Sequence, residues 1–454
     1  MIKVSLVTHT DIDPIELASH AALICYQAET PEMGKKIDVE NRLFKVGHHT
    51  TLQHFFATFT IEGIAVSDIT FGMHLASPFY NSDQKSGRYC AKMFLNPNYD
   101  KIEGYVKRFW PEIKSAELKK IIDYVRFGVE TYHSNINEAT KVSRKFLEKE
   151  RPYINDKALE MNAPKIAQEQ MRMFIPTIFP TSFDFTVNLT TLVAMYESAW
   201  TPAMKYATRR MVKLLVNQVP SIKFMFNEKR VRNDEWAMEV PSAKSIKVKY
   251  KPGFKLLNIS GEDEFIIPNS EMMHPVDKLH FLPEMMDNSF GEIKTQVEIS
   301  TATMGQDQRH RTIGRSQPRF TGNFYLPPVP KALGLKETAI KMAKKWSSFS
   351  GIPETLKMIL APYGAMVTYK KRGSFNAVAH EQGKRLCWCA QEEIYHAGRF
   401  LRLAIKKENG NNSKLLRMLE PPCYANGKCG EGTRYCGRDM KIVKPGDYFP
   451  VRRV

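Results

Sequence analysis

The feature of this sequence that most restricts its fold is an order of parts that occurs twice. Within residues 42–90, the run FFATFTIEGIAV alternates apolar and polar side chains, and a helix-like segment and a polar loop follow it. Within residues 279–320, the run GEIKTQVEIS has the same alternation and is followed by the same two parts. Alternation of this kind predicts a strand with one buried face. A long internal repeat of strand, helix and loop indicates two related units.

A second pair of matching segments lies downstream of the first. Residues 171–215 and 356–404 each begin with an apolar stretch that reaches a proline, Pro176 or Pro362. Each then continues through a short connection into a helix-like segment. The parts recur in the same order in both halves of the chain, which predicts two tandem domains.

The two domains are expected to meet near residue 240, which gives residues 1–240 and 241–454. Around this boundary, residues 227–255 are charged and weakly periodic, as a linker or an opening β element would be. Residues 103–150 are also charged, and we expect them to form exposed helices that have only a shorter counterpart in the second half.

The composition indicates a globular protein with an anionic partner. The chain has 454 residues, of which 43% are hydrophobic, and its formal net charge is +18. Such a charge suits nucleic acid, a membrane surface or phosphorylated small molecules. The basic residues are spread along the chain and form no Lys/Arg-rich tail, which disfavours nucleic acid. The sequence contains neither an apolar run of membrane-spanning length nor a signal-peptide pattern, so we expect a cytoplasmic protein outside the membrane.

Cysteines concentrate near the C-terminus. Of the seven in the chain, five lie between residues 387 and 436. This is not the layout of a secreted disulfide framework, and it suggests a structural zinc site formed by four thiolates. The alternative is a set of partly buried thiols in a reducing cell. The candidate ligands are Cys387, Cys423, Cys429 and Cys436.

One basic run stands out in the second half. Residues 305–320 read GQDQRHRTIGRSQPRF. Alone, such a run is typical of a solvated basic face or a nucleic-acid contact. Two segments of the first half favour another interpretation, GHHTTLQH at residues 47–54 and SGRY at residues 86–89.

Taken together, these segments resemble the flavin-dependent thymidylate synthases. The pattern of that family includes His-x-Thr, an Arg-His-Arg tripeptide preceded by Gln, a Ser-x-Arg-Tyr loop, and a late Arg followed by Ala-Gln-x-Glu-Ile. The first half of the chain keeps the early motif and the loop but has Gln53 for Glu, Thr70 for Gln, and MHL where the tripeptide is expected. The positions that match in the first half are His48, Thr50, His74, Ser86, Gly87, Arg88, Tyr89, Arg172 and Asn188.

The second half is nearly the inverse of the first. It lacks the early His and Thr, has Met358 where the first half has Arg172, and shortens the loop to QPRF, of which only Arg319 matches. The positions that match in the second half are Gln306, Arg309, His310, Arg311, Arg385, Ala390, Gln391, Glu393 and Ile394. The two halves together contain one complete set. We therefore expect the loop of the first half to pair with the tripeptide of the second, and the reverse pairing of MHL with QPRF to be catalytically silent.

The resemblance implies a fold, a reaction and an assembly. The fold is α/β of the α+β type, and each copy has a central, mostly antiparallel sheet with flanking helices. The reaction is the methylation of dUMP to dTMP by a methyltransferase that uses FAD, methylenetetrahydrofolate and NADPH. Because the family assembles as tetramers, two tandem chains are expected to form an equivalent homodimer.

The resemblance also suggests a role for each matched residue. An arginine fork and hydroxyl donors suit a nucleotide phosphate, and a fixed cation beside N3 and O4 of uracil helps negative charge to develop on the ring. The catalytic candidates are Arg385, Arg309 and His310. The substrate-binding candidates are Ser86, Gly87, Arg88, Arg172, Gln306 and Gln84. The cofactor-binding candidates are His48, Thr50, Asn188, Arg309, His310, Arg311 and His380.

Two alternatives remain open at this point. The altered MHL segment and loop spacing are compatible with a different one-carbon product at C5, such as hydroxymethyl-dUMP. The loss of Glu at Gln53 is compatible with a descendant that binds nucleotides or nucleic acid without catalysis.

Overall fold

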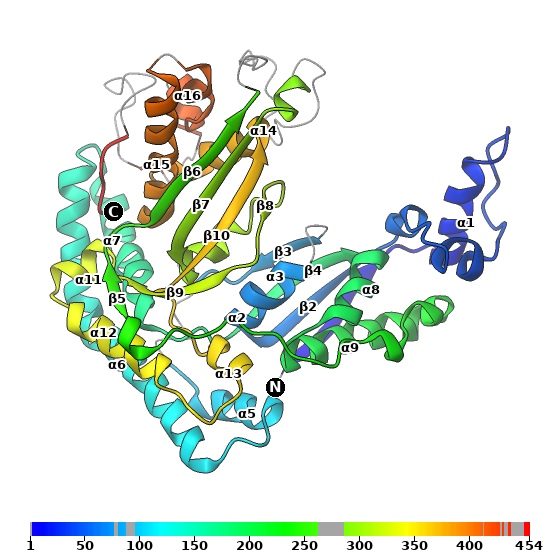
Figure 1. Ribbon diagram of the computed structural model, residues 1–454, viewed down its shortest axis with the longest axis horizontal. Coiled ribbons are helices and arrows are strands. Elements are labelled where there is room, and N and C mark those ends of the chain that lie inside the picture. The colour runs from blue at the N-terminus through cyan, green and yellow to red at the C-terminus, as the bar shows by residue number, and fades with distance from the viewer. Residues whose placement is uncertain are drawn as a thin grey trace.

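The protein is described by a computed structural model, which covers residues 2–76, 80–87, 96–261, 286–411, 413–426, 429–430, 435–436 and 449–454. Two β-sheets form its framework (Figure 1). The first sheet consists of β1 (Lys3–His9), β2 (Phe56–Ala65), β3 (Tyr80–Gln84) and β4 (Pro180–Asn188). The second consists of β5 (Lys247–Lys249), β6 (Gly253–Ser260), β7 (Glu292–Ser300), β8 (Gly314–Arg315), β9 (Arg319–Tyr325) and β10 (Ala365–Ser374).

The two sheets have the same strand order. The first runs β1-β2-β4-β3, and the second runs β6-β7-β10-β9 with β5 added beyond β9 and β8 paired to β10. All of these neighbours are antiparallel except β5 and β9, which are parallel. The α/β fold with mostly antiparallel sheets and flanking helices is therefore confirmed.

Sequence periodicity found one central strand in each sheet and missed the other. Both alternating runs are strands, β2 and β7, in which every second side chain is buried over most of the length. The strands β4 and β10 follow Pro176 and Pro362, where only a short connection was expected. Their segments contain long apolar stretches, which do not distinguish a buried strand from a helix.

Helices follow and separate the strands. In the first half these are α1 (Pro14–Ile24), α2 (Val66–Asp68), α3 (His74–Ala76), α5 (Tyr99–Phe109), α6 (Ser115–Glu150), α7 (Asp156–Met171), α8 (Leu189–Ser198) and α9 (Pro202–Gln218). In the second half they are α10 (Thr301–Asp307), α11 (Pro328–Ala332), α12 (Lys336–Ser347), α13 (Glu354–Ile359), α14 (Phe375–Arg385), α15 (Glu392–Asn409), α16 (Lys414–Met418) and α17 (Pro422–Asn426).

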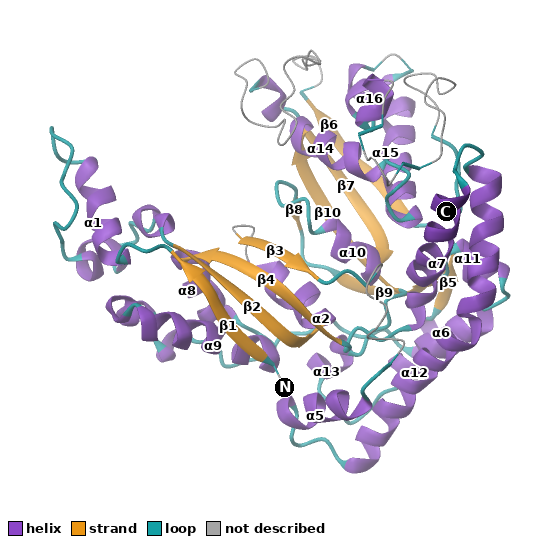
Figure 2. Ribbon diagram, turned by 180° about the vertical axis from the view of Figure 1, so that it is seen from behind, coloured by secondary structure: helices purple, strands orange, loops and turns teal. Residues whose placement is uncertain are grey.

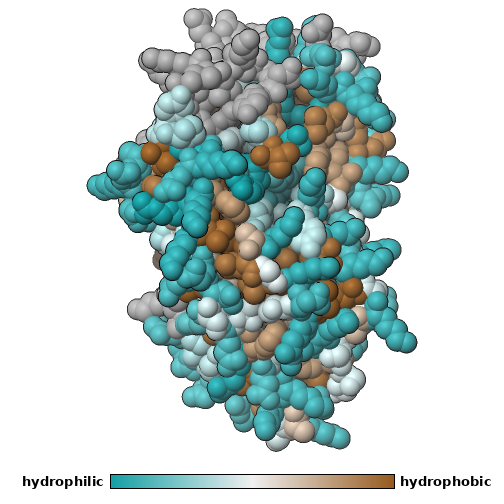
Figure 3. Space-filling model, turned by 90° about the vertical axis from the view of Figure 1, so that its left-hand side faces the viewer, coloured by the Kyte–Doolittle hydropathy of each residue, from teal (hydrophilic) through white to brown (hydrophobic). Residues whose placement is uncertain are grey.

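The helices occupy matching places in the two halves. The helix α9 packs on β1 and β2, and α15 packs on β6 and β7, so the long helix after each central strand covers its own sheet. On the face that carries α7, α11 and α12, hydrophilic side chains surround smaller apolar patches (Figure 3). None of the described helices has both the length and the apolar character needed to cross a membrane.

The charged segment 103–150 is helical, but it is not simply exposed. The helix α6 has a buried stripe that includes Tyr124 and Val125, and it packs against α5, α7, α11 and α12 (Figure 2). At Gly128 the contact is so close that a Cβ atom would lie 2.3 Å from the carbonyl oxygen of Phe174. The charged side chains of α6 line its outer face, while its buried apolar stripe belongs to the core.

The halves meet through reciprocal backbone hydrogen bonds. The amide of Thr177 donates to the carbonyl of Ala361 at 2.8 Å, and the amide of Tyr363 donates to the carbonyl of Ile175 at 2.9 Å. Pro176 and Pro362, between these pairs, form an antiparallel bridge. A contact in which two equivalent segments exchange the same bonds is the signature of a local two-fold axis.

A shared core surrounds this contact. One cluster of buried side chains includes both Phe174 and Phe324, whose ring centroids are 5.8 Å apart. The indole of Trp110 donates to the hydroxyl of Thr355 at 3.2 Å. The two halves are therefore packed as one body, although each has its own sheet.

A buried carboxyl ties elements of the first half together. Asp68, at the end of α2, is fully buried and accepts hydrogen bonds from the hydroxyls of Tyr105 and Thr201, both at 2.6 Å. Burial raises the pKa of Asp68 from 3.8 to about 6, although both hydroxyls favour the ionised form. The folded state therefore binds a proton more tightly than the unfolded chain does.

We expect Asp68→Asn to change how stability depends on pH. The stabilisation from a raised carboxyl pKa is complete below pH 3.8 and is lost as the pH rises to about 6. The free energy of unfolding of the variant minus that of the parent should therefore increase by about 3 kcal/mol across this interval. Urea unfolding at half-unit pH steps measures it. A difference that does not vary with pH would mean that folding leaves the pKa of Asp68 unchanged.

Candidate functional site

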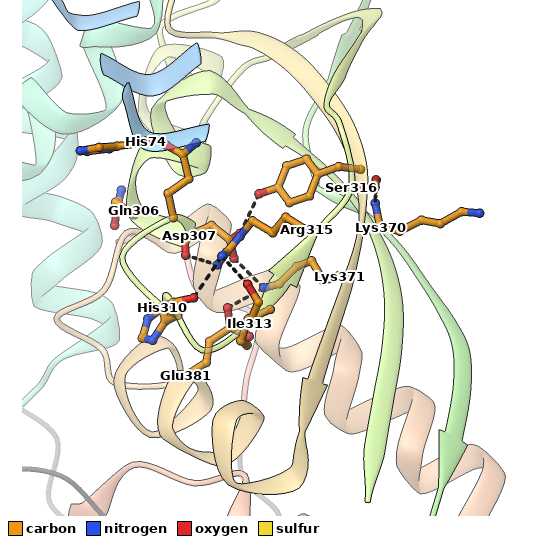
Figure 4. A network of polar contacts seen from close by, with 12 residues as sticks. His74, Gln306, Asp307, His310, Ile313, Arg315, Ser316, Lys370, Lys371 and Glu381 are labelled. Atoms are coloured by element: carbon orange, nitrogen blue, oxygen red, sulfur yellow. Dashed lines mark hydrogen bonds and ion pairs between the residues drawn. The ribbon is translucent and has the colours of Figure 1, made fainter. Parts of the chain in front are cut away.

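The segment after α10 is held by a buried network of charges (Figure 4). The carboxylate of Asp307, the last residue of α10, accepts from Arg315 Nε at 2.6 Å, from Lys371 Nζ at 2.5 Å and from the hydroxyl of Tyr369 at 2.8 Å. Lys371 also donates to Glu381 Oε1 at 2.5 Å. The positive charges of Arg315 and Lys371 are thus paired with the carboxyl groups of Asp307 and Glu381 in a buried setting.

The cations of this network set the titration of its carboxyl groups. Burial alone would raise the pKa of Asp307, but Arg315 and Lys371 hold it well below its usual range. Burial raises the pKa of Glu381 despite its contact with Lys371. Arg315 also donates to the carbonyls of His310 and Ile313, at 3.0 and 2.9 Å. The network therefore fixes the backbone that carries residues 309–311.

The three residues of this segment have different surroundings. Arg309 is exposed, whereas His310 is buried, and its ring centroid lies 5.8 Å from that of His380. Burial, with the positive charge of Arg385, lowers the pKa of His310 to about 2. The guanidinium of Arg311 donates to Asn81 Oδ1 at 3.1 Å and to Ser82 Oγ at 3.3 Å, on β3. This segment of the second half therefore lies against the first sheet.

Residues predicted from both halves meet around one amide. The side-chain oxygen of Gln391 accepts from Arg172 at 2.9 Å and also from the side-chain amide of Gln306. Arg385 donates to the backbone carbonyl of Gln306 at 2.5 Å. Gln391, fully buried at the start of α15, carries no role in the sequence-based assignment, although it belongs to the matched Ala-Gln-x-Glu-Ile run. We call Arg172, Gln306, Arg385 and Gln391 the inter-half cluster.

The SGRY loop of the first half approaches this cluster. The side-chain amide of Gln168, one turn before Arg172, donates to the carbonyl of Gly87 at 3.3 Å. Ser86 is half-buried, and Gln84 ends β3. Arg88 and Tyr89 lie outside the described residues.

A buried glutamate is linked to the inter-half cluster through Thr303. Glu393 accepts from the backbone amide of Ser300 at 2.7 Å and from the hydroxyl of Thr303 at 2.5 Å. Thr303 in turn accepts from Gln391 Nε2 at 3.2 Å. Burial raises the pKa of Glu393 to about 7, although these donors favour its ionised form. Glu393 thus links the N-terminus of α10 to that of α15.

Three predicted cofactor residues lie elsewhere. His48 and Thr50 are exposed, next to a short 3-10 turn that packs on α1, α8 and β4. Asn188 caps α8 by accepting from the backbone amide of Thr191 at 2.8 Å. The α1 segment extends away from the second sheet in both ribbon views (Figures 1 and 2). His48 and Thr50 therefore lie with the α1 segment. Asn188, in contrast, follows Val187, which pairs with Tyr80 beside Arg311.

A cavity lies where the MHL segment of the first half meets the QPRF loop of the second. It has a volume of about 580 Å³. It is bordered by His74 and Leu75 of the MHL segment and by Gln317 and Pro318 of the QPRF loop. Its remaining lining residues are Tyr80, Trp200, Arg232, Trp236, Gln308, Arg311, Ile313, Gly314, Arg315 and Ser316. The MHL segment and the QPRF loop thus border a cavity, and the sequence patterns did not indicate Trp200 or Trp236 as part of it.

The C-terminal thiols share one neighbourhood. Burial, together with the thiols of Cys387, Cys436 and Cys429, raises the pKa of Cys423 to about 12. In the described part of the chain, however, no three His, Cys, Asp or Glu side chains are arranged to hold a metal ion. The four-cysteine zinc site stays a prediction.

Comparison with known proteins supports one family. The family model described as "Thymidylate synthase complementing protein" matches residues 5–222. A flavin-dependent thymidylate synthase from Clostridium tetani is 23% identical over 229 residues, which are 49% of this chain and 83% of the relative. These matches support the flavin-dependent thymidylate synthase family for the first half of the chain. The family model covers the half that keeps His48, Thr50 and the SGRY loop.

Solved structures add a weaker likeness. Two crystal structures of flavin-dependent thymidylate synthase X from Helicobacter pylori, each described as containing FAD and dUMP, are 16% and 18% identical. Each covers 51% of this chain and 100% of its own chain, with TM-scores of 0.32 and 0.33.

We expect Asp307→Asn to destabilise the protein by about 3–5 kcal/mol, because it leaves Arg315 and Lys371 buried without their shared counterion. Urea unfolding measures the loss. The matched control is Glu354→Gln, which removes an exposed carboxylate from its contact with Lys357 and should cost less than about 0.5 kcal/mol. Equal effects of the two substitutions would contradict a structural role for the network.

Proposed function

We propose that this protein converts dUMP to dTMP by flavin-dependent reductive methylation, in a composite site built from both halves of the chain. Methylenetetrahydrofolate would supply the carbon and NADPH the two electrons. The C5 hydrogen of dUMP would leave as a proton, and tetrahydrofolate and NADP⁺ would be the other products. The two halves, 1–240 and 241–454, would be tandem copies of one family domain, as their common strand order and reciprocal contacts suggest.

The observation that carries this proposal is the inter-half cluster. Arg172 comes from the first half, and Gln306 and Arg385 come from the second, yet all three are joined through or beside Gln391. The family pattern in each half alone lacks part of this set. Their convergence within one chain supports the pairing of the first-half loop with the second-half tripeptide.

Unsatisfied polar atoms beside the cluster fit bound ligands. Buried side-chain atoms without a partner among the described residues include Gln306 Oε1, His310 Nε2 and Arg311 Nε. Buried polar atoms are costly unless a ligand or water completes their hydrogen bonds. Arg309, His310 and Arg311, with His380, would hold the anionic flavin, which supplies the redox chemistry when bound. The FAD and dUMP named for the Helicobacter pylori enzymes are ligands of the kind this site would take.

The chain's own residues would then bind and polarise the nucleotide. Ser86, Gly87, Arg88 and Arg172, with Gln84 at the end of β3, would contact the phosphate and sugar. Arg385 would place a fixed positive charge beside N3 and O4 of uracil, which makes C5 nucleophilic by stabilising charge on the ring. His310, whose pKa burial lowers to about 2, would remain neutral and act through its unpaired nitrogen.

A second copy of the chain would complete the site. His48, Thr50 and Asn188 lie at the end of the first sheet that faces the extended α1 segment. This segment exposes apolar side chains, including Tyr26 at 81% and Val46 at 60%. Apolar groups so exposed on a segment carrying predicted cofactor residues are typical of an interface. We therefore propose a homodimer in which each chain inserts this segment beside residues 309–311 of its partner.

We expect Arg385→Ala to lower the rate of hydrogen release from C5 of dUMP at least about 100-fold, because one preorganised cation is removed from the site. Tritium release from [5-³H]dUMP with FAD, NADPH and methylenetetrahydrofolate measures this rate. Arg309→Ala should behave in the same way. The matched control is Arg319→Ala in the eroded loop, which should stay within about twofold of the parent.

An equal loss in Arg319→Ala would contradict the single productive pairing. If the parent protein binds no FAD and releases no tritium, the proposed reaction is wrong. The mass of the nucleotide product separates methylation from hydroxymethylation.

Complementation tests the proposed dimer. Chains with His48→Ala and chains with Arg385→Ala should each be inactive, but a purified heterodimer of the two should recover about half the parent activity per dimer, because one of its two sites is intact. Two affinity tags isolate the heterodimer, and tritium release measures its activity. An inactive heterodimer would mean that His48 acts within its own chain.

A further inference from the structure

Apart from Arg311, the residues that line the cavity between the MHL segment and the QPRF loop have no role in the proposed reaction. Arg172, Gln306, Arg385 and Gln391 do not line it, so the inter-half cluster lies outside its walls. Degeneration of its segments removed the residues that the family pattern would place there, yet about 580 Å³ of space persists. This volume is within the range typical of small-molecule sites.

The walls of the cavity are positively charged. Arg232, Arg311 and Arg315 line it, and none of its described lining residues is acidic. Arg315 is held by Asp307 at 2.6 Å and Arg232 by Asp234 at 2.5 Å. The described contacts of Arg311 are with neutral groups, since it donates to Asn81 and Ser82.

Arg311 therefore keeps an unbalanced charge at the cavity wall. Its guanidinium also lies 4.8 Å from the ring centroid of Tyr80, and its buried Nε has no partner among the described residues. A guanidinium in this setting is suited to a phosphate or carboxylate, which it contacts through two parallel N–H groups.

Aromatic side chains also line the cavity. Trp200 and Trp236 meet edge to face, with ring centroids 5.9 Å apart. The indole of Trp200 is fixed by donating to the carbonyl of Phe71 at 3.0 Å. His74 stacks on Tyr80, with centroids 5.1 Å apart and ring planes 11° apart. Rigid aromatic walls of this kind favour a flat ring, which can stack on them.

We propose that this cavity is a second ligand site, which binds a flat aromatic anion of mononucleotide size without transforming it. The ring would lie against Trp200 and Trp236, and the anionic group would contact Arg311 and Arg232. The site is distinct from the inter-half cluster but shares Arg311 with the segment that carries Arg309 and His310. A ligand bound in this cavity would therefore contact the same segment that contributes Arg309 and His310 to the composite site.

Intrinsic fluorescence of the full-length protein tests this site without using turnover. The cavity holds two of the five tryptophans, so binding of dUMP as a probe should quench emission. Arg232→Ala and Trp236→Ala should each weaken this quench about tenfold, whereas Arg230→Ala should not. Arg230 belongs to the same chain segment but does not line the cavity, and it pairs with Glu197 at 3.8 Å. Inorganic phosphate, which lacks a ring, should bind more weakly than dUMP.

The outcomes separate this proposal from the proposed reaction. Arg385→Ala should abolish tritium release and keep the quench, and Arg232→Ala should weaken the quench and keep tritium release. No quench at millimolar dUMP, or an equal effect of Arg230→Ala and Arg232→Ala, would overturn the second site. Joint loss of quench and tritium release in Arg232→Ala, with unchanged thermal stability, would identify the cavity with the catalytic site and also overturn it. A quench without any tritium release would refute only the reaction.

Discussion

The arrangement of this protein depends on the reciprocal backbone hydrogen bonds on either side of Pro176 and Pro362. Backbone groups at this point are buried, so each must find a partner, and each half supplies the partner of the other. The same exchange sets α10 of one half against the segment after β2 of the other, where Gln308 donates to the carbonyl of Thr70 at 2.9 Å. The local two-fold relation therefore brings complementary segments together in one chain.

If the two halves are the tandem copies proposed above, this relation accounts for one composite site built from both of them. An interface with a two-fold axis creates two equivalent places for ligands, and each uses segments from both halves. In this chain one place collects Arg172, Gln306, Arg385 and Gln391, while the other keeps a cavity lined by His74, Trp200 and Trp236. The proposed chemistry would use the first place, and the proposed second ligand would occupy the other, with Arg311 between them.

Buried charged groups have two different roles in this structure. Asp307 neutralises Arg315 and Lys371 beneath the tripeptide, and Glu393 joins α10 to α15 behind the cluster. Arg311, in contrast, meets neutral groups only among the described residues, and its charge is directed toward the cavity. Paired charges hold the backbone in place, whereas the unbalanced charge is available for a ligand.

The sequence alone determined the repeated order of parts, the strands β2 and β7, and the family resemblance, because periodicity and spaced motifs are local properties of the chain. It also selected Arg172, Gln306 and Arg385, which prove to be neighbours. Only the tertiary structure decided that Gln391 joins them, that Asp307 and Lys371 support the tripeptide, and that the eroded segments enclose a cavity. These features depend on contacts between residues far apart in the chain, which no local pattern encodes.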